Sequence, residues 1–303
     1  MYQDIVLHLN TATFTAQELA SQLPPIQERC NISDEIWVGR LDNALAKTVL
    51  DVCEPRSTGV GTGPIRQYGH LYAFARDVSE DSTAVWRWDE DHRLSVAVAL
   101  SRLVHPTTLG FRYAARIRFD QREEIVQAYP AEIQGMGREA WLSPNRTRDW
   151  LVPSEVELLR ELVAIEPSSI PMRISNALWY LDYAFRTYYL DVRWTLICTG
   201  LEALFHTDKN RSMPEFRNRI PSVAADLGIQ LTADQGEQVF QLRSTLAHGE
   251  SFLYRWGIPN PQHVALYDQI EDILRAVILR ALRDANYAQT FTDPQQIRSR
   301  WPI

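Results

Sequence analysis

Residues 240–249 read Phe240-Gln241-Leu242-Arg243-Ser244-Thr245-Leu246-Ala247-His248-Gly249. Apolar residues in and just before this stretch recur at spacings of three and four, which predicts a helix whose buried face carries Val239, Leu242 and Leu246. Arg243 stands at the edge of that face, where a charged side chain seldom lies without a partner. His248 falls at the expected helix end, and Gly249 supplies the left-handed residue that stops a helix.

An arginine and a histidine at a helix end offer the two groups that RNA cleavage requires, a cation for the phosphate and an imidazole that moves protons. A simpler interpretation is that His248 suits the helix dipole and that Arg243 pairs with a neighbouring carboxylate. Residues five apart on an ideal helix are separated by about 140°. One phosphate therefore meets both side chains only if His248 swings round at the helix end or a second subunit completes the site.

A second segment accompanies this motif. Leu201-Glu202-Ala203-Leu204-Phe205 ends a helix expected to begin near Leu190, and residues 242–249 follow it after a shorter helix. Together the two segments resemble the ApeA-like branch of the HEPN superfamily, over roughly residues 165 to 290. In that family an R-x4-6-H motif, here Arg243 and His248, marks metal-independent endoribonucleases, many of them toxins or antiviral defence effectors. Members usually carry Asn or Asp directly after the arginine, where this chain has Ser244.

The resemblance implies a homodimer in which two R-x4-6-H motifs meet across the interface. Arg243 would hold the scissile phosphate, and His248 would act as general base or general acid. Ser244 and Glu202 would orient these catalytic groups, Glu202 by positioning Arg243. The implied substrate is single-stranded RNA, cut to a 2′,3′-cyclic phosphate and a 5′-hydroxyl without metal or other cofactor. Whether an antitoxin or a phage-derived trigger controls the cutting stays open. Some family members have lost catalysis and serve as interaction modules.

Composition is that of a soluble globular protein, with 45% apolar and 23% charged residues. No apolar run is long enough for a membrane span, and the N-terminus lacks the pattern of a signal peptide. Cys30, Cys53 and Cys198 are expected as reduced thiols, without a disulfide or a zinc site, which favours the cytoplasm. The net charge of −7 argues against nonspecific coating of nucleic acid, and Lys47 and Lys209 are the only lysines, a bias that a GC-rich genome explains.

The fold expected is mainly α. Residues 165–290 predict a four- to five-helix bundle of HEPN type, because apolar stripes at helical spacing follow Pro171, Leu190, Met213-Pro214, Thr232 or Asp234, and Pro259-Asn260-Pro261. Residues 1–150 predict a mixed α/β domain that regulates or recognises, and residues 291–303 a C-terminal tail. In the first domain we expect a helix from Ser33 to about Val52 and strands at 70–76 and 111–119. Residues 94–104 fit either a helix or a buried strand, and residues 134–150 read as a loop.

Four other stretches are weaker candidates for a site. Gly59-Val60-Gly61-Thr62-Gly63-Pro64 lacks the strand-loop-helix context of a phosphate loop. Asp89-Glu90-Asp91-His92, with Asp81 nearby, is better explained as an acidic helix start than as a metal site. Ser101-Arg102-Leu103-Val104-His105-Pro106 is similar to a stretch in ApeA-like proteins, and a structural turn explains it better than ligand sensing. Trp86, Trp88 and the aromatic residues from Trp179 to Trp194 suit a core better than base stacking.

The leading hypothesis from the sequence is therefore a dimeric HEPN-type endoribonuclease. Its rival is a non-catalytic HEPN-like module, in which Arg243 and His248 hold a dimer together and residues 1–150 sense a ligand or bind a partner. A third possibility is an enzyme whose site lies in the N-terminal domain.

Overall fold

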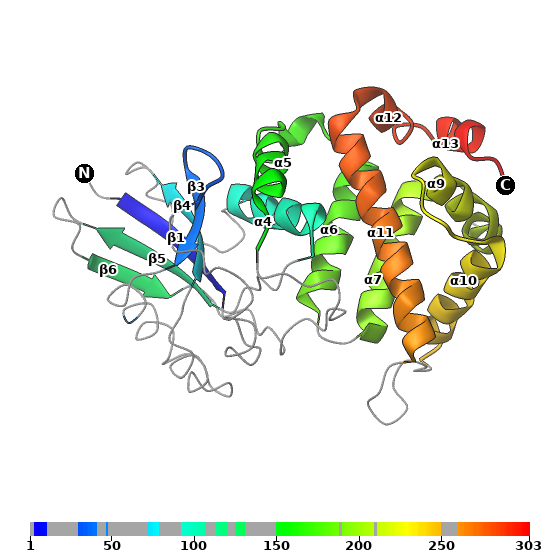
Figure 1. The fold of residues 1–303 in the computed structure, drawn as a ribbon, viewed down its shortest axis with the longest axis horizontal. Coiled ribbons are helices and arrows are strands. Elements are labelled where there is room, and N and C mark those ends of the chain that lie inside the picture. Colours follow the sequence, from blue (N-terminus) through cyan, green and yellow to red (C-terminus); the bar gives the residue numbers. More distant parts are fainter. Residues whose placement is uncertain are drawn as a thin grey trace. The chain divides into compact units, whose positions relative to one another are not determined.

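A computed structural model describes residues 3–10, 30–40, 47, 72–78, 92–106, 113–119, 125–130, 150–187, 190–208, 211–249 and 260–303 of the chain (Figure 1). The described chain is mainly helical, as predicted. It divides into two compact units. Unit 1 comprises 1–101, 107–139 and 147–163, and unit 2 comprises 102–106, 140–146 and 164–303.

Unit 1 contains a sheet of antiparallel pairs in the order β2-β3-β4-β1-β5-β6. The strands are β1 (Gln3–Asn10), β2 (Cys30–Asn31), β3 (Ile36–Arg40), β4 (Tyr72–Val78), β5 (Tyr113–Phe119) and β6 (Ile125–Pro130). β4 and β5 confirm the two strands expected from alternation over the described residues, 72–76 and 113–119. In the register, Ile5 of β1 lies opposite Asp77 of β4 on one side and Ile117 of β5 on the other.

The helix predicted from Ser33 to Val52 is wrong over Ile36–Arg40, which forms β3. Ser33 does accept backbone hydrogen bonds, from the amides of Glu35 at 3.3 Å and Ile36 at 3.0 Å, but it closes a turn rather than a helix. Three consecutive residues, Ile36, Trp37 and Val38, are buried. A strand covered on both faces carries such a run, and apolar spacing alone does not distinguish it from a helix.

Residues 94–104, which fitted either a helix or a strand, form the helix α4 (His92–Val104). Nearly every described side chain from Leu94 to Val104 is buried, so the segment has no polar face to reveal a period. Helix α5 (Pro153–Val163) follows in unit 1, where Arg160 donates to the backbone carbonyl of Asn31 at 2.9 and 2.7 Å.

Unit 2 is built from helices. They are η3 (Pro167–Ser169), α6 (Met172–Arg186), α7 (Leu190–Phe205), α8 (Ser212–Pro214), the π-helical turn η4 (Glu215–Arg219), α9 (Ile220–Asp226), α10 (Ala233–Ala247), α11 (Pro261–Arg283), α12 (Ala285–Gln289) and α13 (Pro294–Arg300). The predicted apolar stripes form the core. Buried members are Ile174, Ala177, Leu181, Phe185, Trp194, Ile197, Leu201, Leu204, Phe216, Ile220, Val223, Leu266, Ile270, Ile273, Val277 and Ile278.

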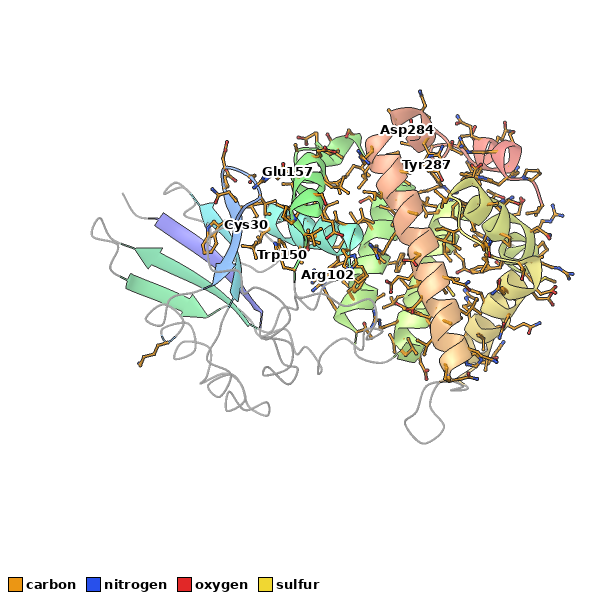
Figure 2. All side chains as sticks on the ribbon, in the orientation of Figure 1. Cys30, Arg102, Trp150, Glu157, Asp284 and Tyr287 are labelled. Carbon is orange, nitrogen blue, oxygen red and sulfur yellow. The ribbon has the colours of Figure 1, made fainter. Side chains whose placement is uncertain are left out.

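Residues 291–303, expected as a tail, are packed into this unit. The rings of Phe205, Tyr287, Phe291 and Trp301 form an aromatic cluster, with Phe205 and Trp301 edge to face at 5.5 Å between centroids. Figure 2 labels Tyr287 of this cluster. Phe205 is the last residue of α7, so the C-terminal segment covers the end of the helix that carries Glu202.

Candidate active site

Helix α10 is held at its N-terminal half. Thr232 caps it with a capping box, because its hydroxyl accepts from the Gln235 amide at 3.2 Å while the Gln235 side chain accepts from the Thr232 amide at 2.9 Å. Gly236 lies so close to η4 that an added Cβ would stand 2.2 Å from the carbonyl oxygen of Phe216. Val239, one turn later, is fully buried. These contacts fix the helix and so direct its C-terminal turns.

Arg243 lies on the following turn and meets the carboxylate predicted for it. Its Nη2 is 2.9 Å from Oε2 of Glu202, on the last turn of α7. The arginine side chain is 31% exposed and the glutamate 18%. A charge-assisted hydrogen bond in this half-exposed position holds the guanidinium in one orientation while leaving part of it open to an anion.

His248 occupies the C-terminal cap of α10. Its backbone amide donates to the carbonyl of Ser244 at 3.1 Å, and Gly249 follows with a φ of +82°, the left-handed stop expected from the sequence. The His248 residue is exposed and Ser244 is half-buried. Within the described residues no hydrogen bond or ion pair joins His248 to Arg243 or Glu202. The fold thus brings Arg243 and Glu202 together, and leaves His248 separate within one chain.

Cys198 lies one helical turn before Glu202 and is completely buried. Burial raises the pKa of its thiol well above the usual range, the negative charge of Glu202 raises it further, and Arg243 opposes both. The thiol is consequently neutral, and the Arg243–Glu202 ion pair lies at the edge of the buried core.

One constellation was not predicted from the sequence. His206, directly after the Leu-Glu-Ala-Leu-Phe segment, has its Nδ1 2.7 Å from Oε2 of the buried Glu215. Arg219 donates to the other oxygen of Glu215 at 2.6 Å and to the Phe205 carbonyl at 2.7 Å. The i, i+4 spacing of Glu202 and His206 was the available signal, because side chains four apart share a face where a helix continues that far.

The described contacts of the segment Ser101–Pro106 hold the fold together. Arg102 is 1% exposed and its Nη1 is 2.6 Å from Oδ1 of Asp182, within unit 2 (Figure 2). Arg275 donates to the backbone carbonyls of Leu103 at 3.1 Å and Val104 at 2.8 Å. The segment therefore has a structural role, as expected, but its residues 101–104 form the last turn of α4 rather than a turn between elements. Trp194 is a core residue as predicted, whereas Trp179 is half-buried beside Tyr183, a ring that is exposed.

Several other candidates cannot be placed. Residues 59–64, 81, 86, 88 and 89–91 lie outside the described part of the chain. Across the residues that are described, no group of three or more His, Cys, Asp or Glu side chains is arranged to hold a metal ion.

No helix among the described residues has the length and apolarity needed to cross a membrane. Comparisons of the chain with family models, with curated proteins and with solved structures gave no match.

Proposed function

We propose that this protein is a metal-independent endoribonuclease of HEPN type that cleaves single-stranded RNA. The observation that carries the proposal is the Arg243–Glu202 ion pair, half-exposed on the last turns of two helices, with the exposed His248 closing the same helix. An oriented guanidinium and an accessible imidazole, once brought together, supply charge neutralisation and proton transfer. The resemblance to ApeA-like sequences supports the same reading.

In the proposed reaction Arg243 binds the non-bridging oxygens of the phosphate and neutralises the charge that builds on them. The 2′-oxygen attacks phosphorus as it loses its proton to a base, the O2′–P bond forms, and the P–O5′ bond breaks as the 5′-oxygen gains a proton. An imidazole can fill either role near neutral pH. The products are a 2′,3′-cyclic phosphate and a 5′-hydroxyl. DNA lacks the 2′-hydroxyl and should not be cut.

The site is proposed to be complete only in a homodimer. Arg243 and His248 are about 140° apart around α10, so one chain does not present both on one face. Leu242 and Leu246, four apart on one face of the C-terminal turns of α10, are also left half-buried, an apolar surface that pairing would cover. Partners beyond a second copy and RNA, such as an antitoxin or a phage-derived trigger, stay proposals, as does a toxin or antiviral role in the cytoplasm.

The test is cleavage of a single-stranded RNA oligonucleotide in excess EDTA. His248→Ala should abolish cutting while the melting temperature stays within a few degrees, because an exposed residue at a helix end contributes little stability. Arg243→Ala should also inactivate, and Arg243→Lys should restore only part of the rate, since an ammonium cannot reproduce the guanidinium fork. Undiminished cutting by His248→Ala would refute the assignment.

One observation favours the rival, a non-catalytic interaction module. The Arg243 guanidinium already has a carboxylate partner inside its own chain, which a purely structural arginine would also have. The module predicts no cutting by the wild-type protein under any condition, together with loss of the dimer in Arg243→Ala.

A further inference from the structure

One oxygen of the Glu215 carboxylate, Oε2, orients the imidazole of His206. Glu215 has two oxygens with separate partners. Oε1 accepts from Arg219 at 2.6 Å, from the Thr207 amide at 2.9 Å and from the Thr207 hydroxyl at 3.1 Å. Among the described residues Oε2 has His206 Nδ1 as its partner, at 2.7 Å. The three donors on Oε1 suffice to hold the end of α7 to η4, so the contact to His206 is additional to that structural task.

Arg219 and Glu215 are buried, and the exposed fraction of the side chain rises at His206. The side chains of Glu215 and Arg219 are 4% and 1% exposed, whereas His206 is 32% exposed. A buried carboxylate on Nδ1 selects the tautomer that carries its proton there, which leaves the lone pair on Nε2. Glu215 itself stands in the π-helical turn η4, a rare geometry that is frequent at functional sites.

His206 also follows directly on the last turn of α7, which carries Glu202. Its backbone amide donates to the carbonyl of Glu202 at 2.8 Å, so α7 is still helical between the two residues. Side chains four apart on a helix are neighbours, with Cβ atoms about 5–6 Å apart. Glu202 in turn holds Arg243 at 2.9 Å. By this spacing the imidazole of His206 is expected on the same side of the chain as Glu202, the carboxylate that holds the guanidinium.

We infer that His206 is a second proton-transfer group of the site formed by Arg243 and Glu202, and that it acts as the base on the RNA 2′-hydroxyl. This inference rests on the proposed function. Nε2 of His206 takes the proton from the 2′-oxygen as the O2′–P bond forms, and Glu215 stabilises the resulting imidazolium. His248 of the second chain gives its proton to the 5′-oxygen as the P–O5′ bond breaks. Each imidazole then has one role.

The experiment compares wild-type protein with His206→Asn, His248→Asn and, as a matched control, His105→Asn, a half-buried histidine of unit 2 outside the site. Initial rates of RNA cutting are measured with melting temperatures. His206→Asn should lower kcat about 10²- to 10⁴-fold, as expected for loss of a general base, with KM within a few-fold. His105→Asn should cut at the wild-type rate. In parallel, the imidazole Cε1–H signals of wild-type protein are followed by NMR while a non-cleavable 2′-deoxy oligonucleotide is added.

The outcomes separate the two proposals. If His206→Asn cuts at the wild-type rate while His248→Asn is inactive, the role of His206 is overturned and the nuclease assignment stands. If wild-type protein cuts nothing, the nuclease assignment falls. The base role of His206 falls with it. The NMR titration tests the location separately, because a His206 signal that does not shift with the oligonucleotide overturns the place of this residue at the RNA site even where the protein cuts. The titration needs no variant, so an unfolded His206→Asn does not block the test.

Discussion

At the scale of single residues, the chemistry of Cys198 follows from its position beneath the Arg243–Glu202 pair. Burial and the charge of Glu202 both raise the pKa of the thiol, so the reactive thiolate is absent at pH 8. We expect iodoacetamide at that pH to leave Cys198 unmodified in the native protein and to modify it fully in guanidinium chloride. Peptide mass spectrometry reads the result. Alkylation of native Cys198 as fast as half-exposed Cys30 would contradict the buried position.

Two arginines offer a contrast between buried and exposed charge. Arg102→Met removes a partner of the buried Asp182, which among the described residues keeps Arg186 at 2.6 Å. We expect a loss of about 3 kcal/mol in the free energy of unfolding, the lower end for a broken buried pair. Arg217→Ala breaks the exposed pair with Glu237 at 3.1 Å and should cost less than about 1 kcal/mol.

Urea unfolding of the two variants measures both values. The RNA-cutting rate of folded Arg102→Met at low temperature should equal that of the wild type, because Arg102 contacts neither Arg243 nor His206. Equal losses in the free energy of unfolding for the two variants would show that the buried Asp182 does not need its ion pair with Arg102.

At the scale of elements, the capping box of α10 can be tested by itself. Thr232→Ala removes the hydroxyl that accepts from the Gln235 amide and should destabilise the protein by about 1 kcal/mol. Thr232→Ser keeps the hydroxyl and should fall within a few tenths of the wild type. Thermal unfolding compares the three proteins, and identical midpoints for the alanine and serine variants would disprove the cap.

The ends of elements were predictable where residues close by in the sequence determine them. Thr232 and Asn260 cap helices through contacts with residues two or three positions away, and Gly228 and Gly249 end helices by adopting positive φ. β3 was missed because a run of three buried apolar residues is compatible with both periods. β1 and β6 were not predicted. The π-helical turn η4 was missed as well, since a tertiary contact network rather than an apolar period defines it.

At the scale of the whole molecule, the number of chains in the assembly decides whether two copies can share the proposed site. We predict a dimer in solution, with a mass twice the 34.9 kDa of one chain by light scattering at micromolar concentration. Leu242→Glu and Leu246→Glu place charge on the half-buried surface at the end of α10 and should shift the mass toward one chain. A monomeric wild-type protein that still cuts RNA would exclude a site shared between two copies.

The sequence by itself determined the helical class, the ends of most helices in unit 2, and the Arg243, Glu202 and His248 candidates. Those features depend on residues within about one helical turn, or on a motif that can be read along the chain. Only the tertiary structure decided which distant charges meet. Arg102 and Asp182 are 80 positions apart, and Arg219 and Trp301 are 82 apart. The contact of His206 with Glu215 likewise depends on how η4 packs beside α7. No periodic pattern records such pairs, because they form only when packing brings separate elements together and burial makes an unpaired charge costly.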